Sequence, residues 1–333
     1  MNLSVNPINI IKTNYSTTKQ TPYLKKLSCD TVSFSSNPKA LKDSRINQAV
    51  DLGYKIYDNS VKNKGLKVAE IIKEKEPNVQ VLPISELAKE RFDASNYAAY
   101  FSFDFSDDIE PIDIKLYASL EPKNDSRMLQ LIYAMEIAHE YTHLKQQTDR
   151  YDTEFLQKIA KGNREYLTLL NGLAGRIFSA FDTQVQANQV LLTLNEKDIE
   201  AFSKYSQITP VAKNIHTNGF LKANNFSNQD EFNEFVDDVF EYLFNGTLSK
   251  IAQDSTEVEK RVQDAFKTYI SSGGSIEQLK EDSKKYCAHC AKTEIEAYTT
   301  ESKLAKRILK VKDGLNIDAF VIYYDLLAKA LEQ

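Results

Sequence analysis

The sequence predicts an α+β fold in which a small, mostly antiparallel sheet and one helix are followed by a large, all-helical lobe. Strict alternation of apolar and polar residues, the pattern of half-buried strands, is confined to the stretch between residues 79 and 120. From residue 152 onward the apolar residues recur at helical spacing. Between these stretches lies the run His-Glu-Tyr-Thr-His at residues 139–143, inside a segment that itself has helical periodicity.

Three segments are expected along the 333 residues, which suffice for one large domain or two closely packed lobes. Residues 1–38 are rich in Ser, Thr, Asn and Lys, and their few apolar side chains predict a disordered leader. Residues 39–150 are expected to form an α/β N-terminal lobe that ends in the helix with the histidine pair. Residues 151–333 are expected to form the helical C-terminal lobe.

Local patterns predict the elements of the N-terminal lobe in order. They are helices over residues 39–59 and 65–75, a strand over 79–83, a turn of helix over 85–91, and strands over 101–105 and 112–120. The run Asp-Asp-Ile-Glu-Pro at residues 107–111 predicts a hairpin loop between the last two strands. Residues 124–126 (Asn-Asp-Ser) are expected to cap the helix with the histidine pair, whose apolar face turns both imidazoles inward.

The C-terminal lobe shows only helical patterns. They cover residues 155–160, 166–181, 185–194, 231–244, 256–270, 276 onward and 318–331. No internal repeat accompanies them.

Composition excludes several classes of protein. The net charge of −5, from 42 basic and 47 acidic residues, offers no basic field for a nucleic acid partner. No stretch approaches the 18 apolar residues of a transmembrane segment, and the N-terminus lacks the apolar core of a Sec-type signal peptide. The expected location is therefore the cytoplasm, or outside the cell by another export route. Three cysteines are too few for a disulfide framework, and the oligomeric state stays open.

The run at residues 139–143 has the H-E-x-x-H pattern of zinc hydrolases. Residues four positions apart share one face of a helix, so both imidazoles can reach one ion at the usual Zn–N distance of about 2.0–2.1 Å. The sequence predicts His139 and His143 as Zn²⁺ ligands and Glu140 as the general base beside a metal-activated water.

A hydrolytic zinc ion needs a third protein ligand, and two positions compete for that role. Metzincins place it six residues after the second histidine, which falls here on Asp149, but Gln146 then occupies their glycine position. The favoured candidate is Glu294, on the apolar stripe of a helix, where a carboxylate needs a partner such as a metal ion. Glu301 and Glu296 are the alternatives, and periodicity puts Glu296 on the solvated side.

With both motifs in view, the chain resembles the gluzincin metallopeptidases, the thermolysin-like group of zincins. In that group a Glu from a later helix joins the H-E-x-x-H pair, and the second motif commonly begins E-x-x-A, as in Glu294 to Ala297. Tyr298 stands where many members carry an acid or amide that steadies a zinc-bound histidine. The resemblance implies a zincin-like fold and a zinc-dependent endopeptidase that acts on a peptide or protein substrate.

The same resemblance implies a substrate-binding edge strand and a donor to the oxyanion. Either predicted strand, 101–105 or 112–120, could pair with an extended peptide. Tyr298, His216 and His289 are the candidate oxyanion donors, with ordinary exposed side chains as the alternative for the histidines. The competing function is a helical interaction protein whose metal site is inactive or structural.

Overall fold

The computed structural model describes residues 38–62, 67–87, 99–118, 127–189, 217–247, 257–311 and 317–333. The N-terminal part consists of α1 (Pro38–Val61), α2 (Val68–Lys75), β1 (Gln80–Pro83), α3 (Ile84–Leu87), β2 (Ala99–Phe105), β3 (Pro111–Ala118) and α4 (Arg127–Thr148). This order confirms the predicted helices, strands and hairpin. The predicted cap at residues 124–126 and residues 1–37 of the leader lie outside the described residues, whereas Pro38 already begins α1.

The remaining elements are helical throughout the described ranges. They are α5 (Tyr151–Ala160), α6 (Arg164–Gln189), α8 (Thr217–Ala223), α9 (Gln229–Tyr242), the π-helical turn η3 (Leu243–Thr247), α10 (Glu257–Ser271), α11 (Ile276–Leu309) and α12 (Asp318–Leu331). Helix α6 is continuous through residues 182–184, where the sequence predicted a break between two helices. Helix α8 was not predicted. The structure therefore has an α+β composition, mostly helical with one small sheet.

The sheet has three strands in the order β1-β3-β2. Strand β2 pairs with β3 antiparallel through the hairpin, and β1 pairs with β3 parallel. The sheet is therefore mixed. A mostly antiparallel sheet was predicted, and this prediction is wrong for β1, which pairs with β3 in parallel. Alternation along a strand predicts which face is buried, but it contains nothing about the direction of the neighbouring strand.

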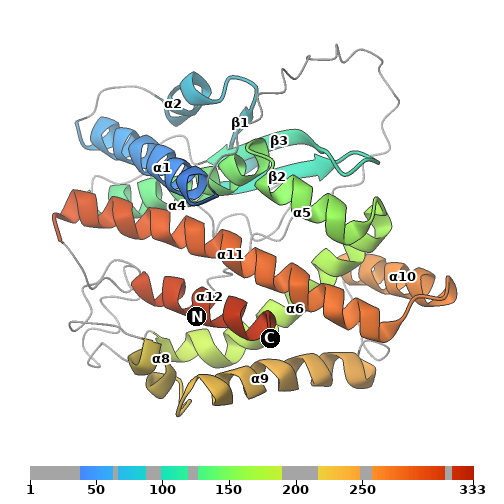
Figure 1. Cartoon of the computed structure of the whole chain (residues 1–333). Coiled ribbons are helices and arrows are strands. Elements are labelled where there is room, and N and C mark those ends of the chain that lie inside the picture. Colours follow the sequence, from blue (N-terminus) through green and yellow to red (C-terminus); the bar gives the residue numbers. More distant parts are fainter. Residues whose placement is uncertain are drawn as a thin grey trace.

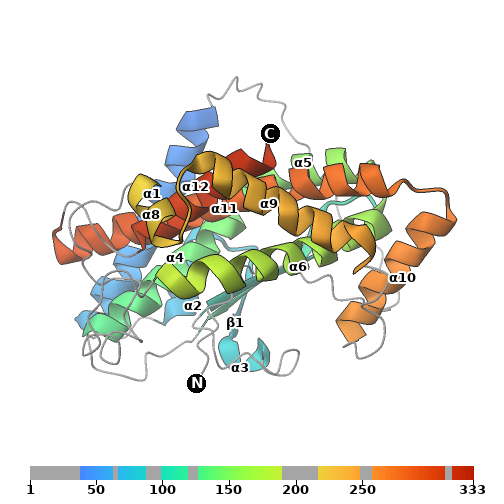
Figure 2. The ribbon, with the colours of Figure 1, turned by 90° about the horizontal axis from the view of Figure 1, so that it is seen from below.

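Helix α11 runs through the middle of the molecule and joins its two parts (Figure 1). It packs against α1 and α4 on one side and against α12 and α6 on the other. Seen from the end opposite the sheet, α9 crosses in front of this helix (Figure 2). One apolar cluster includes residues from α1, the sheet, α4, α11 and α12, so α11 is surrounded along its central turns.

Strand β2 lies at one edge of the sheet, next to β3, and it also contacts α4. Its alternate residues Phe101, Phe103 and Phe105 are buried, as the period-2 pattern predicted. Within the described residues, no helix combines the length and apolar character needed to cross a membrane.

Candidate metal centre

Helix α4 places its two motif histidines side by side in the interior. His139 and His143 are both buried, and their Nε2 atoms lie 3.2 Å apart. The four-residue spacing puts both rings on one face of the helix, as the sequence predicted. Each ring turns its other nitrogen, Nδ1, toward a different hydrogen-bonding partner.

Helix α11 brings Glu294 to the same point from the far end of the chain. One carboxylate oxygen lies 3.4 Å from His139 Nε2, and the other lies 3.5 Å from His143 Nε2. Glu294 is 4% exposed, and its Oε2 has no hydrogen-bond partner. The ligand atoms of the three residues all lie within 4.8 Å of one another, so this group could hold a metal ion.

The Nδ1 atom of His139 lies 2.5 Å from Oε1 of Glu301, two turns beyond Glu294 on α11. Burial lowers the pKa of His139, but the nearby carboxylates of Glu294 and Glu301 outweigh it and hold that pKa well above its usual value. Glu301 was weighed from the sequence only as an alternative metal ligand. In the structure its described contact is with the outer nitrogen of His139.

Tyr298 contacts the same histidine through its ring. The Tyr298 and His139 ring centroids are 4.8 Å apart with an edge-to-face geometry. The opposite side of Tyr298 stacks on Phe320 and Tyr324 of α12. These contacts pack Tyr298 against the histidine. The partner of His139 Nδ1 is Glu301, and not the residue at position 298 where the gluzincin resemblance placed such a partner.

The Nδ1 atom of His143 contacts Gln146, one turn further along α4, at 2.9 Å from Oε1. The amide nitrogen of Gln146 donates to the carbonyl of Thr293 and to Glu296. Glu296 in turn receives two hydrogen bonds from Arg45 of α1. Sequence reasoning missed Gln146 and Arg45, although the i, i+3 spacing of His143 and Gln146 is a local signal.

Two expectations about α11 are wrong. Glu296, placed on the solvated side by periodicity, is 3% exposed because α1 covers that side of the helix. The exposed side chain weighed as the alternative role of His289 is also wrong. His289 is buried, its Nε2 lies 2.8 Å from Asp152, and its ring stacks on Phe155. A helix buried on several sides has no solvated stripe from which periodicity could choose.

Glu140 points toward the sheet. The backbone N–H of Phe101 in β2 donates to Glu140 Oε2 over 2.8 Å. Burial raises the pKa of Glu140 to about 8, although the nearby His139 and the Phe101 hydrogen bond act in the opposite direction. The candidate general base therefore lies between the histidine pair and an edge strand.

The other candidate residues lie elsewhere. Asp149 is exposed at the end of α4, next to Lys145, and is not among the clustered residues. His216 lies outside the described residues. Cys287 is buried, which raises the pKa of its thiol, and Cys290 is partly buried with a raised thiol pKa as well.

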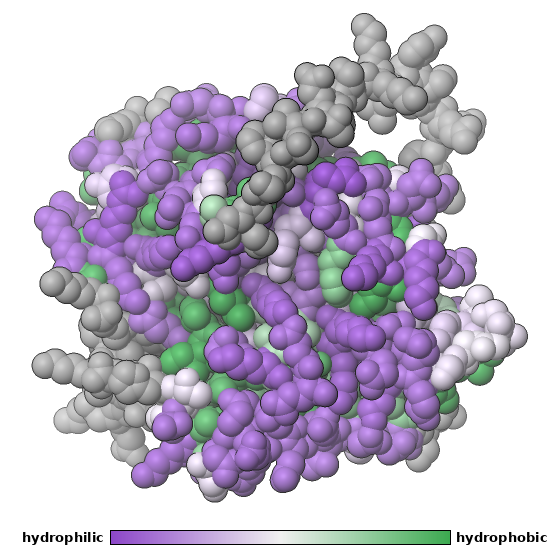
Figure 3. Space-filling view, viewed as in Figure 1, coloured by the Kyte–Doolittle hydropathy of each residue, from purple (hydrophilic) through white to green (hydrophobic). Residues whose placement is uncertain are grey.

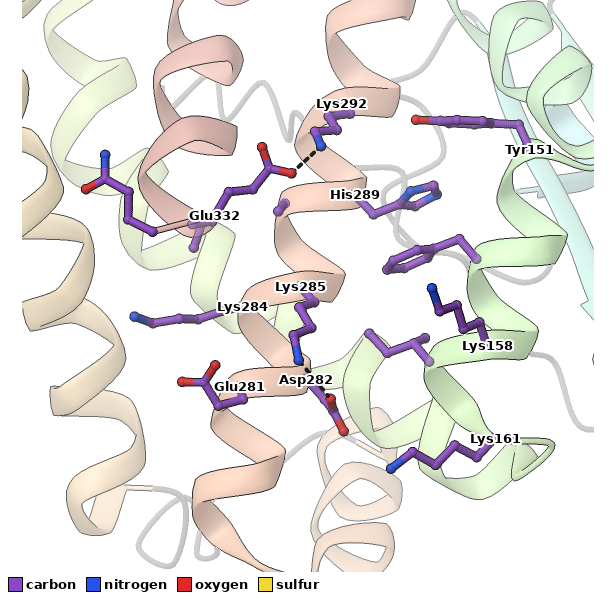
Figure 4. A pocket seen from close by; sticks show the side chains of 15 residues that line it. Tyr151, Lys158, Lys161, Glu281, Asp282, Lys284, Lys285, His289, Lys292 and Glu332 are labelled. Atoms are coloured by element: carbon purple, nitrogen blue, oxygen red, sulfur yellow. Dashed lines mark hydrogen bonds and ion pairs between the residues drawn. The ribbon is translucent and has the colours of Figure 1, made fainter. Parts of the chain in front are cut away.

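A pocket of about 730 Å³ opens between α5, α11 and the end of α12. Lysines from both α5 and α11 surround it, and Lys292 pairs with Glu332 at its edge (Figure 4). His289 lines it, whereas the three clustered residues do not. The pocket is thus separate from the metal centre.

The face that contains α11 is mostly hydrophilic, with apolar residues visible only in small groups (Figure 3).

Comparison of the chain with protein-family models, with curated proteins and with solved structures finds no match. The functional argument therefore depends on the residues and their geometry.

Proposed function

We propose that this chain is a zinc-dependent endopeptidase of the gluzincin kind, with a zincin-like arrangement of edge strand, H-E-x-x-H helix and a later helix that supplies Glu. His139, His143 and Glu294 would hold the ion, and Glu140 would be the general base. Two imidazoles and one carboxylate are a ligand set of catalytic zinc sites, which keep a fourth position for water or substrate.

The distances between the donor atoms carry this proposal. Donors that share a tetrahedral ion at about 2.0–2.1 Å must lie roughly 3.3–3.4 Å from one another. The two Nε2 atoms are 3.2 Å apart. Glu294 Oε2 lies 3.4 Å from His139 Nε2, and the other oxygen, Oε1, lies 3.5 Å from His143 Nε2, so each imidazole faces a different oxygen of this carboxylate at close to that spacing. Glu294 Oε2 has no hydrogen bond, and an ion between the three side chains would bind this carboxylate together with both Nε2 atoms.

A bound zinc ion would lower the pKa of water and polarise the scissile carbonyl. The residues of the chain supply the remaining steps. Glu140 would accept the proton of the attacking water on a carboxylate oxygen and pass it to the leaving amine. The Phe101 N–H, 2.8 Å from Glu140 Oε2, would hold that carboxylate in place. Tyr298 and His216 stay as candidate donors to the oxyanion.

The edge strand β2 suits an extended peptide substrate. Its antiparallel partner β3 lies on one side, and the helix that holds Glu140 also contacts the strand. A peptide paired with this edge would be held by main-chain groups other than the Phe101 N–H, which already donates to Glu140, so recognition would depend little on its sequence. Between the two predicted strands, the structure favours β2 because β3 is the central strand.

A structural metal site is the second candidate, because the three proposed ligands and Glu140 are all buried. The test compares wild type with Glu140→Gln and His143→Ala, using fluorescently labelled casein as substrate and metal content by mass spectrometry. A peptidase should bind about one zinc ion and cleave casein, Glu140→Gln should keep zinc but lose at least about 100-fold in rate, and His143→Ala should lose zinc. Wild type with zinc but with no more cleavage than Glu140→Gln would instead support the structural site.

A further inference from the structure

Gln146 links the histidine pair to a second buried polar group. Its side chain is fully buried between α4 and α11. Its Oε1 lies 2.9 Å from His143 Nδ1, while its Nε2 lies 3.1 Å from the Thr293 carbonyl and 3.3 Å from a Glu296 oxygen. One amide therefore spans the distance between a proposed metal ligand and a carboxylate on the other helix.

The partners of Gln146 determine which way its amide points. The Thr293 carbonyl and the Glu296 carboxylate can only accept hydrogen bonds, so the NH₂ end must face them. The oxygen end then faces His143, and an amide oxygen can only accept. The proton of the neutral His143 ring must therefore be on Nδ1, which leaves the lone pair of Nε2 directed at the metal centre.

Glu296 is itself held by Arg45 from the N-terminal helix. The Arg45 Nε and Nη2 atoms lie 3.0 and 2.9 Å from the two oxygens of Glu296, and both side chains are almost fully buried. This bidentate pair supplies the positive charge that a buried carboxylate needs. It also fixes the carboxylate oxygen that receives the Gln146 amide.

We propose that Gln146 is a positioning residue for the metal centre: braced by Glu296 and Arg45, its amide holds the His143 ring in the tautomer and orientation that present Nε2 to a metal ion. This inference rests on the proposed metal site and adds the chain of contacts that prepares it. His139 is held differently, by the carboxylate of Glu301. A glutamate at position 146 would accept from His143 but would set two carboxylates against each other.

The first test replaces Gln146 by Met, which has a similar shape but cannot make these hydrogen bonds. Gln147→Met is the matched control, because Gln147 is the next residue on α4, is equally buried, and bonds to Asp152 and Thr153 instead. Zinc affinity is measured by competition with a chromophoric chelator. Losing such an outer contact typically weakens metal binding by about 10–100-fold, so we expect this loss for Gln146→Met and none for Gln147→Met.

The second readout needs no metal and no activity. The chain has four histidines, so ¹⁵N-histidine labelling gives few side-chain signals to assign. In the metal-free protein the His143 ring is expected to be the Nδ1–H tautomer. Gln146→Met should remove this preference, and Gln147→Met should retain it. A purely structural role for Gln146 would lower the stability of Gln146→Met without changing the His143 tautomer.

The third test exchanges the amide at position 146 and the carboxylate at position 296. Gln146→Glu alone should weaken zinc binding, because it places its carboxylate about 3.3 Å from that of Glu296. Combining it with Glu296→Gln lets a carboxylate at position 146 accept from His143. The amide at position 296 donates to that carboxylate from the place of Oε2 and accepts from Arg45 Nη2 at the place of Oε1, while the Arg45 Nε hydrogen bond is lost. We expect the double variant to bind zinc more tightly than Gln146→Glu alone.

Zinc binding by Gln146→Met within about threefold of wild type, with an unchanged His143 tautomer, would overturn the inference. A double variant no better than Gln146→Glu would also contradict it. If wild type binds zinc but does not cleave casein, the peptidase proposal is refuted. The positioning role of Gln146 is then still tested by zinc affinity and by the His143 tautomer. Wild type that binds no zinc refutes both.

Discussion

The buried ion pair between Arg45 and Glu296 allows a quantitative test of how the core beside the metal centre is held together. The pair is bidentate, at 2.9 and 3.0 Å, and the two side chains are 3% and 4% exposed. Arg45→Met keeps most of the apolar stem but leaves a carboxylate buried without its cation. Breaking a buried pair from one side costs about 3–5 kcal/mol, and we expect this loss in the free energy of unfolding.

Removing both charges should cost far less than removing one. The double variant Arg45→Met with Glu296→Met replaces the pair with apolar side chains of similar length, which is often close to neutral. The amide nitrogen of Gln146 then still has the Thr293 carbonyl at 3.1 Å as an acceptor. We expect the double variant to lie within about 2 kcal/mol of wild type and to be more stable than Arg45→Met.

The measurement is urea unfolding at pH 7, followed by far-UV circular dichroism, with a chelator present so that metal binding does not contribute. Similar slopes for all variants would show that the same surface is exposed on unfolding. The reasoning is refuted if Arg45→Met loses less than about 1 kcal/mol, the value of an exposed pair. It is also refuted if the double variant is as unstable as the single one. Zinc affinity should stay reduced in the double variant, because Gln146 has lost one of its two acceptors.

Three further outcomes are expected. His143→Ala and Glu294→Ala should purify with little or no zinc, whereas Asp149→Ala should keep about one ion per chain in the same metal analysis, because its side chain lies outside the cluster. Gly53→Ala should lower the thermal midpoint and reduce the free energy of unfolding by about 1–3 kcal/mol, since a Cβ there would lie 2.5 Å from a leucine methyl of α11. An unchanged midpoint would show that α1 and α11 can move apart to make room for the methyl group. Tyr151→Phe should lose less stability than wild type between pH 10 and pH 12. Burial, with the nearby Glu296 carboxylate, raises the pKa of the Tyr151 phenol in the folded protein to about 12. The unfolded chain therefore releases this proton first, from about pH 10, and the wild-type folded state loses stability as the pH rises through this range. Parallel alkaline unfolding curves for the two proteins would contradict this assignment.

Local patterns predicted those parts of the structure that depend on one face of one element. The spacing of His139 and His143 put both rings on one face of α4, and the apolar alternation marked the buried side of β2. The inward direction of Glu294 was also correct, because it lies on the apolar stripe of α11. Each of these features can be read within a few residues of sequence.

Contacts between distant elements could not be predicted in this way. Glu296 was placed in solvent because nothing near it in sequence indicates that α1 covers that side of α11. Its partner Arg45 lies 251 positions away. The parallel pairing of β1 has the same cause, since strand order depends on how the whole chain returns to the sheet. Gln146 is the exception, because its place one turn after His143 could have been tested for a hydrogen bond to that ring.

The charges around the histidine pair bear on the choice between a catalytic and a structural site. Arg45 neutralises Glu296, which leaves Glu294 and Glu301 on either side of His139. Two buried carboxylates beside imidazoles need positive charge near them. The raised pKa of His139 supplies it without a metal, and a bound divalent ion would supply it in either kind of site. Glu140 is different, because a structural ion has no use for an additional carboxylate beside it, and burying that carboxylate disfavours its charged form. A carboxyl group held by the N–H of an edge strand, next to a metal ligand, lies where a general base would act once it is ionised, and this position favours the peptidase.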